Sequence, residues 1–275
     1  MIIDSHQHFW RYHPISHGWI NDQMSMLKKD FLPEDLQKVY LQNGVDACVA
    51  VQADQSEAET DFLLQLAENH DFIKGVVGWV DLRAENIEER LAYYADYPKL
   101  KGVRHVVQDE ADPNFMLRDD FQRGLELLHP YNLTYDLLIF PTQLPAALET
   151  VESFPDLNFV VDHIAKPYIK AGKIDDWAKY MQQIASFPNV MCKLSGMITE
   201  ANWTSWQKAD FKPYLDVVFE AFGTHRLLFG SDWPVCLLAG NYTQVKGIIE
   251  DYISDFNPAA QQDIWANNAM NFYQL

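Results

Sequence analysis

The sequence has little of what membrane-spanning, nucleic-acid-binding or disulfide-stabilised proteins need. It contains no apolar run near the roughly 20 residues that cross a bilayer, and no basic segment with a cleavage site precedes its first strand-like run. Lysine and arginine number 21 against 39 acidic residues, a net charge of −18 that repels phosphate backbones and anionic lipids. We therefore expect a cytoplasmic protein with neither nucleic acid nor a membrane as its partner.

Cysteines are few and odd in number, which argues against a disulfide framework. Cys48, Cys192 and Cys236 lie in or beside apolar runs, a pattern typical of reduced, packed thiols. Low-complexity tracts and Gly/Ser linkers are also absent, so nothing marks a domain boundary. We expect one domain over residues 1–275, because this length lies within the range of single-domain α/β barrels.

The chain does contain a regular alternation of short apolar runs with amphipathic stretches. The runs are near-continuous and rich in β-branched residues, which is typical of strands buried on both faces of a parallel sheet. Their number suits a closed barrel, because eight strand–helix repeats complete one. The runs span residues 1–8, 46–52, 73–81, 100–107, 133–140, 158–163, 190–195 and 226–232.

Helix start signals lie between the runs. Pro33, Ser56 with Glu59 as a capping box, and Asn257 predict helices over 33–43, 56–69 and 258–268. The predicted fold is therefore α/β, a TIM-like (β/α)8 barrel with right-handed crossovers. A doubly wound open sheet is the main alternative, but the glycine-rich turn of a nucleotide site is missing after the first strand.

Two connections are longer than a compact barrel needs. Residues 10–32 and 195–212 are rich in aromatic rings, and each follows a predicted strand. Loops of this length are typically functional, and those after strand C-terminal ends surround the site of a barrel. We expect both to cover the functional site. The segment 10–32 could instead form a subunit contact in a homo-oligomer, and its composition leaves both uses open.

Ionisable residues gather at the ends of the predicted strands. Asp4, His6 and His8 occupy alternate positions of the first run, so all three are expected to face one space. Asp232 closes the eighth run, which is next to the first in a barrel. Imidazoles and a carboxylate so placed can bind a divalent metal ion or position a reacting water. The candidate metal ligands are His6, His8 and Asp232.

Further polar residues end other strands in the same way. His163 ends the sixth run and Arg104-His105 end the fourth, and core filling does not explain them, because buried polar groups need partners. Asp162 alternates with His163, so we expect it to face outward toward a helix. Asp4 either binds an ion directly or orients a histidine.

Each of these residues also has a purely structural interpretation. His6 or His8 alone would be an ordinary hydrogen-bonded core imidazole, and Asp232 alone would be a turn cap. Tryptophans are more often packing residues than recognition residues, but indole faces beside a polar site suit the apolar faces of a sugar ring. The candidate substrate-binding residues are Trp10, Gln52, Trp79, Arg104, Lys193 and Trp233.

Several motifs resemble the amidohydrolase superfamily, in its branch of sugar-lactone and aromatic-lactone hydrolases. They are His6-Gln7-His8, Asp162-His163, Cys192-Lys193-Leu194-Ser195-Gly196 and Gly230-Ser231-Asp232-Trp233-Pro234. Within this branch the chain looks most like the L-fucono-1,5-lactonase type. That closer resemblance lies in the segments 4–10, 104–110 and 233–239.

The resemblance implies hydrolysis of an aldonolactone to its open acid. It also implies that Asp232 activates water, with His6, His8 and His163 around the reacting carbonyl. Superfamily members with two metal ions use a bridging lysine or glutamate on strand four and a histidine on strand five. Here those strands end in Arg104-His105 and in residues 138–140, so two metals are not expected. One divalent ion, zinc by preference, and a reaction without metal stay alternatives.

Opening a lactone requires a proton acceptor, positive charge near the developing oxyanion, and a proton donor for the leaving oxygen. Asp232 is the proton acceptor. The positive charge comes either from a metal ion on the candidate ligands or from protonated imidazole with Lys193 or Arg104. His105 or His163 supplies the proton for the leaving oxygen, and the sequence does not distinguish the two.

The leading hypothesis is therefore a lactonase for a six-carbon or deoxy-sugar lactone, resembling L-fucono-1,5-lactone. One alternative is a hydrolase or decarboxylase of an aromatic-pathway lactone or acid. Such multiply charged substrates need two or more arginines, and only Arg104 is well placed. A second alternative is a barrel that binds a sugar acid without catalysis.

Overall fold

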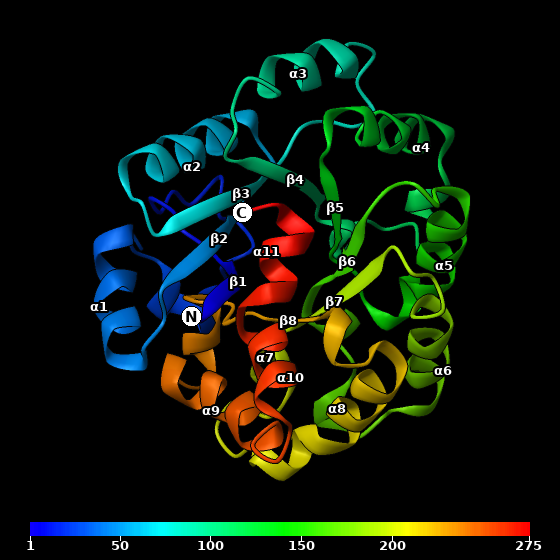
Figure 1. Cartoon of the computed structure of the whole chain (residues 1–275). Helices are drawn as coiled ribbons and strands as arrows, with labels where there is room; N and C mark the ends of the chain where they lie inside the picture. Colours follow the sequence, from blue (N-terminus) through cyan, green and yellow to red (C-terminus); the bar gives the residue numbers. More distant parts are fainter.

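A computed structural model describes residues 1–275. Its eight strands are all parallel and hydrogen-bond in chain order to form a barrel surrounded by helices (Figure 1). The predicted (β/α)8 fold is confirmed, and the doubly wound alternative is wrong. The strands are β1 (Ile3–Gln7), β2 (Ala47–Val51), β3 (Ile73–Gly78), β4 (Leu100–His105), β5 (Thr134–Leu137), β6 (Phe159–Val161), β7 (Val190–Leu194) and β8 (Leu227–Phe229).

The last strand meets the first through backbone hydrogen bonds just beyond β8. The amide of Asp232 donates to the carbonyl of His6 at 2.8 Å, and the amide of His8 donates to the carbonyl of Trp233 at 2.7 Å. The Ser5 hydroxyl adds a bond of 2.7 Å to the carbonyl of Phe229. Closure therefore places the residues that follow β8 beside the end of β1.

The predicted helix starts are largely confirmed. The helix predicted over 33–43 has these bounds, and the side chains of Ser56 and Asn257 cap the helices that begin at Glu57 and Pro258. The predicted capping box does not form, because the Glu59 carboxylate accepts from the amides of Ala53 and Asp54 instead. The stretch 258–268 is not one regular helix, because a π-helical turn at Asp263–Asn267 interrupts it. The helices are α1 (Pro33–Asn43), α2 (Glu57–Asn69), α3 (Ile87–Tyr94), α4 (Asp119–Glu126), α5 (Leu144–Ser153), α6 (Asp175–Ile184), α7 (Met197–Glu200), α8 (Lys208–Phe222), α9 (Tyr242–Tyr252), α10 (Pro258–Gln262) and α11 (Asn268–Tyr273).

The barrel interior has an apolar layer next to α11. This helix packs against inward-facing side chains such as Val49 and Leu228, which form one buried cluster with Phe272 and Tyr273. Figure 1 shows α11 crossing the end of the barrel where the N-terminus lies. All three cysteines are buried and free, as predicted. None of the helices is both long and apolar enough to cross a bilayer.

A charged layer lies above the apolar one. Lys193 of β7 is fully buried, and its ammonium contacts the carboxylates of Asp136 and Asp162, the latter at 3.0 Å. Asp136 also accepts hydrogen bonds of 3.1 and 2.9 Å from the Tyr273 hydroxyl of α11. Burial raises the pKa of Asp136 to about 6, even though Lys193 opposes the shift. One ammonium thus contacts both buried acids.

We predict that Lys193→Met strongly destabilises the fold. Removing one partner of a buried ion pair costs about 3–5 kcal/mol, because an uncompensated charge stays in the interior. The free energy of unfolding in urea measures the loss, and Lys74→Met on exposed β3 surface is the control. A Lys193→Met protein within about 1 kcal/mol of wild type would contradict this account of the charged layer.

Candidate active site

A cavity of about 560 Å³ lies over the C-terminal ends of the strands. This volume is within the range of small-molecule sites, about 300–1,000 Å³. His8, Arg104, His163 and Asp232 line it, each from a different strand end. The two long connections cover it as predicted, through Ser16, Trp19 and Met24 of the first and Thr199, Glu200 and Trp203 of the second.

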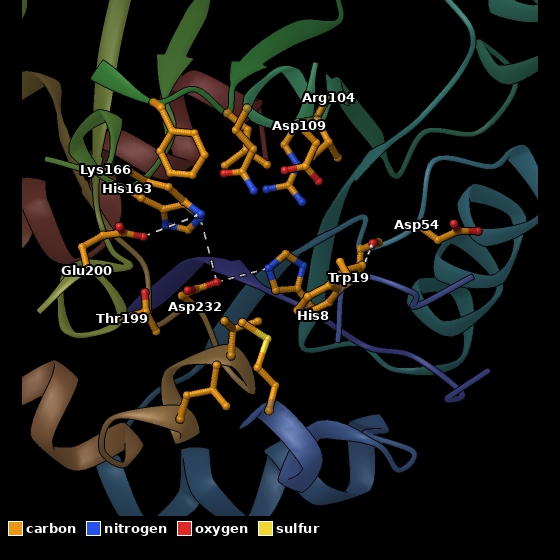
Figure 2. A pocket seen from close by; sticks show the side chains of 18 of the residues that line it. His8, Trp19, Asp54, Arg104, Asp109, His163, Lys166, Thr199, Glu200 and Asp232 are labelled. Carbon is orange, nitrogen blue, oxygen red and sulfur yellow. Dashed lines mark hydrogen bonds and ion pairs between the residues drawn. The ribbon is translucent and has the colours of Figure 1, made fainter. Parts of the chain in front are cut away.

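Asp232 lies between two histidines on the cavity wall, as Figure 2 shows. Its Oδ1 is 3.2 Å from His8 Nε2 and 3.9 Å from His163 Nε2, whereas Oδ2 forms no hydrogen bond within the protein. Burial by itself would raise the pKa of Asp232, but His163, His8 and Lys166 together hold it below its usual value. The carboxylate is therefore ionised at neutral pH and keeps one oxygen for a ligand or water.

His8 is held between two acceptors. Its Nδ1 is 2.8 Å from the carbonyl oxygen of Val51, and its Nε2 faces Asp232. A neutral imidazole carries one N–H, so in either tautomer one ring nitrogen faces an acceptor without a proton. A second proton or a cation between His8 and Asp232 removes this conflict.

His163 is positioned by an unusual piece of backbone. Residues 163–166 all have positive φ, from 47° to 57°, although none is glycine and Ile164 is β-branched. This conformation is strained for L-residues and typical of functional sites. It turns both His163 and Lys166 toward the cavity. Burial lowers the pKa of His163 well below its usual value, so the ring is neutral at neutral pH and its Nδ1 pairs with the Ser195 hydroxyl at 2.9 Å.

His6 lies beneath the cavity and is enclosed by cations. Arg104 Nη1 is 3.3 Å from its Nε2, and Lys193 Nζ is 3.1 Å from its Nδ1. Burial, followed by the Lys193 charge, lowers the pKa of His6 well below its usual value despite the nearby Asp162 carboxylate. The ring is neutral and leaves no nitrogen open to the cavity.

The predicted metal ligands can be tested against this geometry. The 3.2 Å between His8 Nε2 and Asp232 Oδ1 fits a zinc ion bound about 2.1 Å from each atom, and such an ion would resolve the conflict at His8. The donor atoms of His6, His8 and Asp232 also lie within 4.8 Å of one another. Arg104 nevertheless competes for His6. The residues therefore fit one divalent ion on His8 and Asp232, with His6 as a third ligand only when Arg104 withdraws.

The prediction that Asp4 shares a space with His6 and His8 is wrong. The pairing of β1 with β2 shifts register between Asp4 and Gln7, so the strict alternation of faces fails there. Asp4 instead accepts hydrogen bonds of 3.0 Å from the hydroxyls of Tyr40 and Tyr242 and one of 2.8 Å from the Ser231 amide. It fixes the end of β8 to β1 outside the cavity.

Asp162 is also not where its alternation with His163 predicts. Its side chain is fully buried inside the barrel, where Oδ2 accepts a 3.0 Å bond from Arg104 and Oδ1 lies 3.2 Å from His6. Val160 belongs to the inward-facing cluster, so regular alternation along β6 places Asp162 inside as well, and the left-handed turn that starts at His163 then brings the next side chain to the cavity. Burial opposes ionisation of Asp162, but Lys193, His6 and Arg104 hold its pKa well below the usual value.

Several predicted site residues lie outside the cavity lining. His105 is packed behind β4, where it stacks on Phe115 at 4.8 Å and pairs with Glu110 at 2.7 Å. Gln52 supports Arg104 through its side chain at 3.2 Å. The three tryptophans make structural contacts: Trp10 donates to the Lys29 carbonyl, Trp79 donates to His105, and Trp233 packs on Phe9 and Phe31. Lys193 belongs to the charged layer inside the barrel.

Other lining residues were not identified from the sequence. They include Lys166, Glu200, Asp54, Gln108 and Asp109. Lys166 carried a usable signal, because it is an ionisable residue directly after a predicted strand. Glu200 lies in a long connection expected to cover the site, but nothing in that segment distinguishes it from surface acids.

Comparison with known proteins identifies the class to which this barrel belongs. Residues 3–275 match the model of the family described as amidohydrolase. The chain belongs to this family, so the predicted superfamily is confirmed and an enzyme is supported.

The chain is similar to proteins from two Burkholderia species. An L-fucono-1,5-lactonase of Burkholderia multivorans is 40% identical over 99% of this chain and 96% of its own length. The protein of the same name in Burkholderia ambifaria is 35% identical over 99% of this chain and 95% of its own. A crystal structure of a Burkholderia multivorans amidohydrolase with bound zinc superimposes with a TM-score of 0.94 at 39% identity, covering 100% of this chain and 99% of that one.

We predict that Gly196→Ala displaces His163. A Cβ at Gly196 would lie 2.5 Å from His163 Nδ1, and the residue has φ +64°. Gly172→Ala is a matched control, because Gly172 has φ +62° and nothing within 4 Å of its Cβ position. Both variants bear the left-handed penalty of about 1–2 kcal/mol, and Gly196→Ala loses about 1–3 kcal/mol more in unfolding free energy. Equal losses would mean that His163 is not confined by this glycine.

Proposed function

We propose that the protein is a hydrolase that opens a sugar lactone, resembling L-fucono-1,5-lactone, to the free sugar acid. The observation that carries this proposal is an ionised Asp232 with one unbonded oxygen on the wall of a cavity lined by both polar and apolar side chains. The full-length likeness to two L-fucono-1,5-lactonases supports the choice of substrate. A cytoplasmic location is a further part of the proposal.

Asp232 acts as the general base in this proposal. Its free Oδ2 accepts a proton from water while the water oxygen forms a bond to the lactone carbonyl carbon. The bond from that carbon to the ring oxygen then breaks, and the proton passes to the ring oxygen, which becomes a hydroxyl. The product is an open-chain acid, so every atom of lactone and water is accounted for.

Two further groups assist the reaction. The neutral His163 ring presents Nε2 on the cavity side while Nδ1 pairs with Ser195, so an Nε2–H can donate to an oxygen of the lactone. Arg104 keeps positive charge at the cavity floor, although its Nη atoms already bond Gln52, Asp162 and His6. A zinc ion, when bound by His8 and Asp232, would supply Lewis acidity to the reacting water.

The cavity disfavours the aromatic-pathway alternative. Its acidic lining residues are Asp54, Asp109, Glu200 and Asp232, whereas its lysine and arginine residues are Lys166 and Arg104 only. A substrate with several carboxylates would be repelled, and Arg104 has no terminal nitrogen free to bind one. An uncharged polyhydroxylated lactone meets no such repulsion.

We predict that Asp232→Asn lowers kcat about 10²–10⁴-fold, because the amide cannot accept the proton from water. Binding of the lactone is retained, since the substitution is isosteric. Acid release from a panel of aldonolactones at neutral pH measures turnover, and calorimetric titration of the lactone into the slowly reacting variant measures binding. Absence of turnover above background by the wild-type protein would defeat the proposed function and favour the sugar-acid binding barrel.

We predict that Arg104→Met raises zinc affinity about tenfold or more. A hydrogen bond from a charged donor contributes about 1.5–3 kcal/mol, and its loss frees His6 for the ion. Isothermal titration with zinc measures the affinity without any assay of activity, and circular dichroism checks that the variant folds. His8→Ala should abolish binding in both backgrounds. Unchanged affinity in Arg104→Met would show that Arg104 does not compete with metal.

A further inference from the structure

One ion pair on the cavity wall has no part in the steps above. Lys166 closes the left-handed turn after β6, and Glu200 is the last residue of α7, which follows β7. The two side chains are 17% and 20% exposed, and both line the cavity. In Figure 2 they lie next to His163, on the side of Asp232 away from His8.

The pair keeps most of its hydrogen-bonding capacity. Lys166 Nζ and Glu200 Oε1 are 3.8 Å apart, beyond the range of about 2.7–3.2 Å for a hydrogen bond. Neither side chain forms a hydrogen bond elsewhere in the protein. An ammonium with three donors and a carboxylate that only accepts therefore face the ligand space together.

This combination selects for hydroxyl groups. A hydroxyl donates and accepts, so two neighbouring hydroxyls can satisfy an ammonium and a carboxylate at once. A ring oxygen or carbonyl oxygen only accepts, so it could satisfy Lys166 but would leave Glu200 without a donor and would be repelled by it. A substrate carboxylate would be repelled for the same reason. The pair thus matches a diol and not the ester group itself.

The pair is close to the reacting centre. The charge of Lys166 contributes to the low pKa of Asp232, and the charge of Asp232 contributes to the raised pKa of Glu200, of which burial is the main cause. If Asp232 holds the water that attacks the lactone carbonyl, the ligand atoms within reach of the pair are those next to that carbonyl. In an aldonolactone the carbon next to the carbonyl carries the C2 hydroxyl, and the following carbon carries the C3 hydroxyl.

We propose that Lys166 and Glu200 bind the vicinal C2 and C3 hydroxyls of the lactone and set the preference of the enzyme for aldonolactones. The inference rests on the proposed function, because it takes the carbonyl to lie at Asp232. It assigns specificity to two residues that do not take part in the bond changes. Lys166 and Glu200 recognise hydroxyls in this position through charge-assisted hydrogen bonds. A lactone that lacks these hydroxyls leaves both side chains without hydrogen-bond partners.

Steady-state kinetics with two substrates test this proposal. L-fuconolactone is compared with its 2,3-dideoxy analogue for wild type, Glu200→Gln and Lys166→Met. Each substitution should lower kcat/KM for L-fuconolactone by about 10- to 100-fold, mainly through KM, and for the dideoxy analogue by less than about threefold. Lys166→Arg keeps the charge and donors and should recover most of the loss.

Asp109→Asn is the matched control, because it removes the same charge from a part of the cavity away from Glu200 (Figure 2). It should leave the ratio of the two kcat/KM values within about threefold of wild type. Equal losses on both substrates in Glu200→Gln and Lys166→Met would overturn the inference, since the pair would then act on Asp232 or on folding. Failure of the wild-type protein to hydrolyse either lactone would instead count against the proposed function.

Discussion

The site depends on the meeting of the two ends of the sheet. Two backbone hydrogen bonds, from Asp232 to His6 and from His8 to Trp233, fix the segment after β8 to the end of β1. Both bonds join backbone atoms. They bring a carboxylate from one end of the chain within 3.2 Å of an imidazole from the other. Asp4 strengthens the junction by accepting from the Ser231 amide.

The electrostatics of the cavity follow from what lies beneath it. Lys193 and Arg104 occupy the barrel interior together with Asp136 and Asp162, and His6 lies between the two cations. In such a medium of low polarity, charges act strongly on one another. An imidazole with cations at both nitrogens stays neutral, whereas Asp232, with histidines and a lysine nearby, stays ionised. The buried charges thus create a fixed electrostatic field at the floor of the cavity.

Much of this arrangement was predictable from the sequence, because strand number and strand order decide which ends meet. The convergence of His8 and Asp232 required only that the apolar runs form a barrel, whereas His163 reaches them through the left-handed turn. Predictions failed where the backbone leaves regular geometry. A register shift separates Asp4 from His6, and the left-handed turn at 163–166 brings His163 to the side of the strand that Asp162 already faces. Glu200 could not be recognised, since no periodic pattern distinguishes an acid that lines a cavity from a solvated one.

The position of α11 determines from which end small molecules can reach the interior of the barrel. The helix and its apolar partners fill the end of the barrel opposite the cavity, and Tyr273 bonds upward to Asp136. The barrel interior is therefore closed at this end and does not form a channel. Substrate, water and product therefore exchange on the cavity side, past the connections that line it, which include parts of the segments 10–32 and 195–212.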